Sequence, residues 1–264
     1  RDQTRAEQAW QLMEGMEAWA AEILRAHGQR SAVDTLGDGW RQPMPPQAVP
    51  GAVLGGQLRD LGGCFDVNSL VVGGVADERA VQRFARLLRT LRLPPGLAEE
   101  AADWIDADTA PRTGGAEDAH YLGAGHRAAN TPVVHPGELR RLRSMDPRSW
   151  ELLSPYLCAL PTPAGINLNT APWPLWTTLA EGIDEPTARR LAREPGTAYA
   201  SLEGLQLALE REGIAAELSG YTLRSRYFLA EAEIEADGIA FLHTSLLARE
   251  GLDVRVLARV RGRW

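Results

Sequence analysis

Hydrophobic and polar residues alternate in three different ways along this chain, and each pattern predicts its own kind of structure. Residues 2–26 place apolar side chains at helical spacing with glutamates between them, which predicts one long amphipathic helix. Residues 77–216 carry shorter apolar stripes interrupted by Pro and Gly, which predicts a series of helices. From Tyr221 onward apolar and polar residues alternate one by one, which predicts strands.

The segment between the long helix and the helical region is less regular. Gly28 suits the end of the first helix. Residues 29–62 are rich in Pro and Gly and predict loop with short extended pieces, whereas residues 64–72 have strand character interrupted by polar side chains. The helices expected in the middle region cover residues 78–93, 97–105, 139–142, 173–180, 185–193 and 201–211.

The C-terminal alternation predicts an antiparallel meander. Its strands cover residues 228–236, 239–249 and 252–260, with turns at Asp237-Gly238 and Glu250-Gly251. Such a sheet must bury its apolar face, and the long N-terminal helix offers the matching apolar stripe. We therefore expect an α+β core formed by residues 1–74 plus 217–264, interrupted by an inserted all-α domain of residues 75–216.

Composition narrows the class of protein. The 264 residues are 44% hydrophobic and 24% charged, as in soluble globular proteins. A formal charge of −7 argues against general attraction to nucleic acid or to an anionic membrane. No apolar run is long enough to cross a membrane. The chain begins at Arg1 rather than Met, so we expect a processed or truncated product.

Two cysteines, Cys64 and Cys158, permit one disulfide. Their separation in the sequence does not show that they meet. A bridge in an oxidising compartment and two buried thiols therefore both stay open.

The densest cluster of carboxylates lies in residues 101–122. With Asp106 counted as position 1, Asp108 falls at position 3 and Glu117 at position 12, the spacing of carboxylates in an EF-hand calcium loop. Ala110 and Pro111 depart from that pattern, so a calcium loop of another build is the hypothesis. Oxygen-only ligands favour calcium over zinc. The alternative is an acidic, solvated loop capped by Asp108 and Thr113.

The chain resembles the K-type minor pseudopilin family of bacterial type II secretion systems along essentially its whole length. Four features carry the resemblance: the N-terminal helix, D-W-I-D-A-D (103–108) with G-A-E-D-A-H-Y (115–121), I-N-L-N-T-A-P (166–172) and the terminal meander. The resemblance implies a pilin-like fold, a long N-terminal helix packed on an antiparallel sheet, with a large helical insertion.

The resemblance also implies partners, a cation and a place in the cell. It implies assembly with the I- and J-type minor pseudopilins at the pseudopilus tip, in the bacterial periplasm, with the full-length protein anchored in the inner membrane by an apolar helix before Arg1. The role would be mechanical, since a bulky insertion would block addition of a further subunit. Calcium is implied at the matching positions Asp106, Asp108 and Glu117, with Asp103, Asp118 and Thr113 as further candidates.

Two other classes of function compete with this interpretation. Residues 166–193 resemble a helix-hairpin-helix motif, whose backbone amides bind nucleic-acid phosphates, but acidic residues flank the hairpin. A hydrolase could use the paired carboxylates, and His120 and His126 lie near enough in the sequence to suggest a site of nitrogen and oxygen ligands. The chain carries no nucleophile motif and no phosphate-binding loop, so we expect no catalytic activity.

Overall fold

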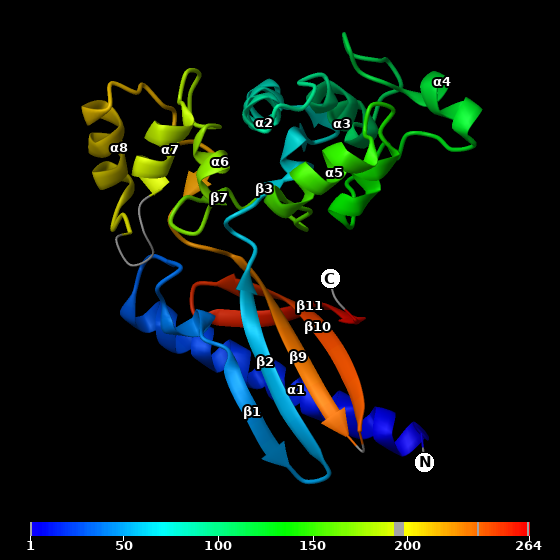
Figure 1. Cartoon of the computed structure of the whole chain (residues 1–264), viewed down its shortest axis with the longest axis vertical. Coiled ribbons are helices and arrows are strands. Elements are labelled where there is room, and N and C mark those ends of the chain that lie inside the picture. The colour runs from blue at the N-terminus through cyan, green and yellow to red at the C-terminus, as the bar shows by residue number, and fades with distance from the viewer. Residues whose placement is uncertain (1, 193–197, 237, 263) are drawn as a thin grey trace. The chain divides into compact units, whose positions relative to one another are not determined.

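The computed structural model describes residues 2–192, 198–236, 238–262 and 264. The chain divides into two compact units (Figure 1). Unit 1 comprises residues 1–62, 194–200 and 223–264, and unit 2 comprises residues 63–193 and 201–222. Helices and strands occur together, so the predicted α+β class is confirmed.

Unit 1 consists of one long helix packed on an antiparallel sheet. Helix α1 (Asp2–Arg30) runs across the sheet, whose strand order is β1-β2-β9-β10-β11 (Figure 1). Helix α1 continues past Gly28, so the predicted C-cap there is wrong. The strands of this sheet are β1 (Met44–Val49), β2 (Ala52–Asp60), β9 (Tyr227–Ala236), β10 (Ile239–Glu250) and β11 (Asp253–Arg261).

The core of unit 1 lies between α1 and one face of the sheet. Along β9, alternate residues from Phe228 to Ala236 are buried, as the predicted meander requires. Ala20 and Leu24 of α1 pack with Phe228, and Trp40 of the 3₁₀ helix η1 (Gly39–Arg41) meets the Phe228 ring edge-on at 5.4 Å. The three C-terminal strands are confirmed, while Asp237 of the predicted turn lies outside the described residues.

Two strands of the sheet were missed because Pro and Gly were taken as breakers. Strand β1 tolerates Pro45 and Pro46 because it is an edge strand, where a missing N–H costs little. Strand β2 uses Gly56 to bring the helix close. A Cβ at Gly56 would lie 2.4 Å from the backbone carbonyl oxygen of Glu231 on β9 and 2.4 Å from the end of the Met16 side chain, so only glycine fits here.

A polar contact joins α1 to the last two strands. Glu17 is buried and accepts hydrogen bonds from Ser245 on β10 at 2.5 Å and from Arg259 on β11 at 2.7 and 2.8 Å. Burial alone would raise the pKa of Glu17, but the hydrogen bonds from Arg259 and Ser245 outweigh it and lower the pKa. The ionised carboxylate therefore helps fix the helix on the sheet.

Unit 2 is predominantly helical. Asp77 caps the first helix by accepting from the N–H groups of Arg79 and Ala80 at 2.9 and 3.3 Å. Phe84 of that helix stacks on Phe65 at 4.9 Å. The α-helices are α2 (Glu78–Thr90), α3 (Leu97–Ile105), α4 (Asp118–Tyr121), α5 (Pro147–Leu153), α6 (Trp173–Trp176), α7 (Glu185–Ala192) and α8 (Leu202–Arg211), joined by the 3₁₀ helices η2 (Val67–Leu70), η3 (Leu122–Ala124), η4 (Pro136–Arg141) and η5 (Ser154–Tyr156).

Most of the predicted helices are present with shifted ends. The segment 139–142 belongs to η4, and α6 ends before the predicted residue 180. Helix α5 was missed, and Arg193, predicted to end a helix, lies outside the described residues.

Short strands also occur in unit 2, so the predicted all-α composition is wrong. The two-residue pairs are β3 (Phe65–Asp66) with β6 (Leu157–Cys158), β4 (Val71–Val72) with β5 (Val75–Ala76), and β7 (Ile166–Asn167) with β8 (Tyr221–Thr222). Cys64 and Cys158 form a disulfide next to the first pair.

That disulfide explains why unit 2 starts earlier than expected. We predicted its limits at residues 75 and 216, whereas the structure places them at residues 63 and 222. The bridge and the β3–β6 pairing attach residues 64–66 to residues 157–158, and the β7–β8 pairing includes Thr222. Among the described helices, none is both long and apolar enough to span a membrane.

Candidate metal centre

Two helices of unit 2 frame the acidic loop, defined here as residues 106–117. Asp106 is the C-cap of α3, and α4 begins directly after Glu117. Between them, the carboxylate of Asp108 accepts the N–H of Ala110 at 2.8 Å and turns the chain ahead of Pro111. The loop therefore brings its first and last residues back together.

Three carboxylates of the acidic loop converge. One oxygen from each of Asp106, Asp108 and Glu117 lies within 4.8 Å of the other two. Asp106 and Glu117 are only 3% and 2% exposed, whereas Asp108 is exposed. The three residues chosen from EF-hand spacing thus form one group, and a cation would reach it from the side of Asp108.

The electrostatics of this group are unfavourable without a cation. Burial raises the pKa of Asp106 to about 6, and the neighbouring carboxylates of Asp108 and Asp103 add to the rise. Burial likewise raises the pKa of Glu117 to about 7, helped by Asp103 and Asp106. Both shifts show that the ionised forms are disfavoured by desolvation and by like charge.

Three oxygens of the same carboxylates lack a hydrogen-bond partner among the described residues. Oδ1 of Asp106 and both carboxylate oxygens of Glu117 are buried and find no hydrogen-bond partner in the part of the chain that the structure describes. Unpaired buried oxygens cost free energy, so their clustering at one point favours an electropositive partner. A bound cation would supply it.

Asp103 on α3 lies beside this group. Its Oδ2 accepts the N–H of Arg112 at 3.0 Å, whereas its Oδ1 is buried with no partner among the described residues. Burial raises the pKa of Asp103. A Cβ at Gly115 would lie 2.0 Å from Oδ2, so the loop can close over Asp103 only with glycine there. Asp103 is therefore a fourth candidate ligand.

Nearby arginines are committed to other acids. Arg112 donates to Glu99 at 2.5 Å and to Glu78 at 2.6 Å, which ties the acidic loop to α3 and α2. Arg143 pairs with Glu100 at 2.9 Å. No described arginine forms an ion pair with the three converging carboxylates, and the charge of Arg112, which lowers the pKa of Asp106, only partly offsets theirs.

An aromatic cluster supports the loop from within unit 2. Trp104 meets Tyr121 edge-on at 5.1 Å, and Tyr121 stacks on His126 at 5.2 Å. Trp104 and Tyr121 are buried, as expected for core anchors. Sequence reasoning missed Asn130, whose side-chain amide donates to the Asp108 carbonyl at 2.7 Å; no local pattern in the sequence points to it.

The remaining candidates do not join the converging group. Asp118 accepts the N–H of Ala128 at 3.0 Å and lies 3.8 Å from Arg127. Thr113 is exposed in the same loop. Nδ1 of His120 accepts the N–H of Glu117 at 3.3 Å, so this ring caps α4 instead of facing the carboxylates. A ligand role for Asp118 and Thr113 stays a prediction.

The donor set fits a hard cation. Asp103, Asp106, Asp108 and Glu117 offer oxygen only, and calcium accepts six to eight oxygen ligands in flexible arrangements. Zinc prefers nitrogen and sulfur donors in structural sites, and none converges here among the described residues. The arrangement therefore fits calcium, whose positive charge would offset the repulsion among these carboxylates.

The hairpin between α6 and α7 offers little to nucleic acid. Arg189 pairs with Glu185 at 2.8 Å and lies over the ring of Trp173 at 4.7 Å. Arg190 pairs with Glu212 at 2.7 Å. Phosphate binding needs free positive charge, and these two cations already have partners within the protein.

Comparisons with known proteins agree with one another. The family model "Type II secretion system (T2SS), protein K" matches residues 63–162. The chain is 32% identical to the type II secretion system protein K of Pseudomonas aeruginosa over 99% of this chain and 83% of that one. It is 30% identical to the protein K of Pectobacterium carotovorum, with 98% and 85% coverage.

A solved structure has the same fold. The chain is similar to one in the crystal structure of the GspK-GspI-GspJ complex from the type 2 secretion system of enterotoxigenic Escherichia coli. The TM-score is 0.81 at 22% identity, over 100% of this chain and 99% of that one. The likeness therefore extends over both units.

Proposed function

Because this chain belongs to the type II secretion system protein K family, we propose that it is a minor pseudopilin at the tip of the pseudopilus, supporting protein export. The observation that carries the proposal is similarity over nearly the whole chain, at 32% identity over 99% of its length. The solved relative was crystallised as a GspK-GspI-GspJ complex, so the proposed partners are the I- and J-type minor pseudopilins.

The two units would divide this role between them. Unit 1 has the layout of a pilin, one long helix on an antiparallel sheet, and would pack its helix against neighbouring subunits. Unit 2 enters the chain after β2 and would be an insertion in that pilin-like frame. A subunit carrying so large an insertion would leave no room for another subunit beyond it, and so would end the filament.

The proposed role needs no catalytic step, because occupying space at the end of a filament changes no covalent bond. The proposed place of action is the periplasm, where type II pseudopilins operate. Anchoring of the full-length protein in the inner membrane belongs to the same proposal.

Co-purification tests the assembly. We expect this chain to form a complex of one copy each with an I-type and a J-type minor pseudopilin, measured by size-exclusion chromatography with light scattering. A matched control replaces the I-type protein with a major pseudopilin. Failure to bind either minor pseudopilin, with calcium and without it, would remove the tip assignment.

Calcium is the second part of the proposal. Asp106, Asp108 and Glu117 would hold the ion, with Asp103 beside them, and the ion would neutralise their charge. Its contribution to stability would follow the free-ion concentration as RT ln(1 + [Ca²⁺]/Kd). In the proposed role, the bound calcium would hold the inserted helices in place during export.

A pair of carboxylate substitutions tests the ligand assignment. Asp106→Asn removes charge from the converging group, so the rise in Tm on adding calcium should be lost. Without calcium the same variant should be no less stable than the wild type, because a repulsive charge has gone. Glu151→Gln changes an exposed carboxylate on α5 of the same unit, outside the acidic loop; it is the matched control and should keep the rise. Equal calcium responses in the wild type and Asp106→Asn would exclude this site.

A further inference from the structure

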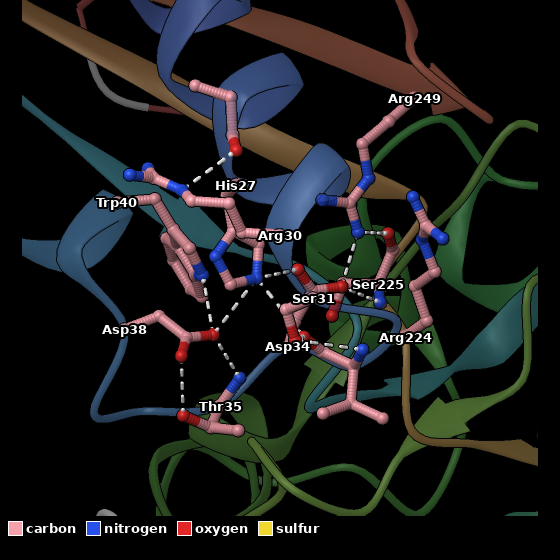
Figure 2. A network of polar contacts seen from close by, with 12 residues as sticks. His27, Arg30, Ser31, Asp34, Thr35, Asp38, Trp40, Arg224, Ser225 and Arg249 are labelled. Carbon is pink, nitrogen blue, oxygen red and sulfur yellow. Dashed lines mark hydrogen bonds and ion pairs between the residues drawn. The ribbon is translucent and has the colours of Figure 1, made fainter. Parts of the chain in front are cut away.

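A second polar cluster lies in unit 1, at the C-terminal end of α1. Figure 2 shows the ring of His27 facing Asp34 and Asp38, which lie in the loop that follows the helix. Its Nε2 atom is 3.1 Å from the Val33 carbonyl oxygen, 3.2 Å from Oδ1 of Asp34 and 3.3 Å from Oδ2 of Asp38. Three oxygen acceptors therefore converge on one nitrogen.

A proton on His27 serves these acceptors poorly. One ring nitrogen carries at most one N–H, and one N–H makes a single good hydrogen bond. All three separations exceed the usual N–H···O distance of roughly 2.9–3.0 Å. The Val33 carbonyl also accepts the hydroxyl of Ser31 at 2.7 Å, and Oδ2 of Asp38 also accepts the Thr35 N–H at 2.7 Å, so these two oxygens do not depend on the ring proton.

The distances from His27 Nε2 to the three oxygens match those between ligands of one metal ion. Two ligands of one zinc ion lie roughly 3.3 Å apart when the bonds are about 2.0–2.1 Å and the geometry is tetrahedral. The distances of 3.1, 3.2 and 3.3 Å from Nε2 to the three oxygens fall close to that value. The ligand atoms of His27, Asp34 and Asp38 also lie within 4.8 Å of one another.

Outer contacts hold Asp34 in place. Its Oδ2 accepts the N–H of Ser225 at 2.7 Å and forms an ion pair with Arg249 on β10, and both charged side chains are only 1% exposed. Oδ1 is thereby turned toward His27 (Figure 2). Carboxylates that bind metals are typically oriented by such contacts through the second oxygen.

Asp38 is oriented in the same way. Its Oδ1 accepts the hydroxyl of Thr35 at 3.0 Å, and its Oδ2 accepts the Thr35 N–H at 2.7 Å and the indole N–H of Trp40 at 3.1 Å. With His27 neutral, the two aspartates carry one more negative charge than Arg249 compensates. The cluster is therefore preorganised and favours a cation.

Part of the cluster is open to solvent. A cleft of about 340 Å³ is lined by His27, Arg30 and Trp40, among others, and so reaches the His27 side chain. Asp38 and His27 keep side-chain exposures of 19% and 13%, whereas Asp34 is buried.

The geometry points to a transition-metal site formed by His27 Nε2, Asp34 Oδ1, Asp38 Oδ2 and the Val33 carbonyl, with zinc as its typical ion. A nitrogen donor combined with carboxylates suits zinc and distinguishes this site from the oxygen-only acidic loop. The ion would tie the end of α1 to the following loop and, through Asp34, to Arg249 on β10. This inference goes beyond the proposed function and does not depend on it.

Zinc titration of the whole chain tests the site. Calorimetry is run in excess calcium, so that the acidic loop is filled. We expect the titration to give one zinc ion per chain. In a thermal melt, zinc should raise the Tm of unit 1. His27→Gln removes the nitrogen donor and should weaken zinc binding at least about tenfold. His135→Gln changes an exposed histidine of unit 2 and should leave the isotherm unchanged.

Cobalt supplies a measurement that needs no variant. Co²⁺ bound to the wild type by one nitrogen and three oxygens in a tetrahedral arrangement should give strong visible absorption, which added zinc abolishes. Zinc binding of equal affinity in the wild type and His27→Gln would overturn the proposal. So would the absence of any zinc heat and any cobalt spectrum, because the cluster would then be held by a proton alone.

Discussion

Buried carboxylates take three different forms in this chain, and each form depends on what the oxygens contact. Glu17 is ionised because Arg259 and Ser245 donate to it. The carboxylates of Asp106 and Glu117 have no such donors among the described residues, and their pKa values rise to about 6 and about 7. Protonation or a bound cation would relieve the second group, whereas Glu17 is already paired with Arg259.

Asp66 in β3 is the third form, a buried acid in which only one of the two carboxylate oxygens accepts hydrogen bonds. Its Oδ1 accepts the N–H groups of Asn68 at 3.1 Å and Leu160 at 3.0 Å. Its Oδ2 is buried without a partner in the described part of the chain. Burial raises the pKa of Asp66 to about 7, against the two backbone hydrogen bonds that lower it.

This raised pKa predicts a pH dependence of stability. The native state binds the proton of Asp66 more tightly than the unfolded chain, whose Asp pKa is about 4. The stabilisation is therefore full below about pH 4 and is lost as the pH rises through about 7. Relative to the wild type, Asp66→Asn should gain on the order of 2–4 kcal/mol between pH 4 and pH 8.

Urea unfolding at several pH values, with EDTA present, measures this difference. Asparagine keeps the Oδ1 acceptor for Asn68 and Leu160, so the variant should fold. Asp103 and the carboxylates of the acidic loop are the same in both proteins, so the effect of their titration cancels in the difference. Parallel pH profiles for the two proteins would show that Asp66 is ionised in the native state.

At the scale of elements, periodicity was a reliable guide and local composition was not. Helix α2 and strands β9 to β11 were found because their apolar positions repeat at one period over many residues. Strands β1 and β2 were missed because tertiary structure, and not local sequence, explains why they contain Pro and Gly. Pro45 and Pro46 lie on a sheet edge, and Gly56 makes room for Met16, which a local sequence pattern cannot show.

The candidate site shows the same limit. Carboxylate spacing was sufficient to choose Asp106, Asp108 and Glu117, because a short loop brings its own ends together. Asp118 was added from the family resemblance; its carboxylate accepts the N–H of Ala128, and its role as a ligand stays a prediction. The cluster at His27 escaped notice since Asp34 is oriented by Arg249, a residue distant in sequence.

The disulfide gives an element-scale prediction. Cys64 and Cys158 are 94 residues apart and join the chain beside β3 to β6 within unit 2. Closing a loop of that length stabilises the folded state by roughly 4–5 kcal/mol in the chain-entropy model. Replacing both cysteines with alanine should lower the unfolding free energy of unit 2 by about that amount.

Reductant provides the matched control for this prediction. Wild type unfolded in urea with excess reductant should lose the same free energy as the double variant, and the double variant should not respond to reductant. A loss below about 1 kcal/mol would mean that the unfolded chain already holds residues 64 and 158 close together.

At the scale of the whole molecule, the two units are stabilised by different kinds of interaction. Unit 1 is stabilised by a continuous helix–sheet core and by the contact of Glu17 with Arg259. Unit 2 is made of short helices joined by long connections, with a disulfide and the acidic loop among its ties. Cations should therefore act on the two units unequally.

Calcium removal should loosen unit 2 and leave unit 1 unchanged. In the absence of calcium, repulsion among Asp103, Asp106, Asp108 and Glu117 favours local opening of the acidic loop and of the helices that frame it. Hydrogen–deuterium exchange measured by mass spectrometry should rise several-fold in peptides from residues 97–133 when EDTA replaces calcium. Peptides from β9 to β11 serve as the internal control, because their hydrogen bonds belong to unit 1.

The Asp106→Asn variant makes the same experiment specific. Its exchange in residues 97–133 should not depend on calcium, while Glu151→Gln should respond like the wild type. An increase in exchange spread evenly over both units would instead mean that the ion stabilises the whole chain. The acidic loop would then not be a site at which calcium stabilises unit 2 locally.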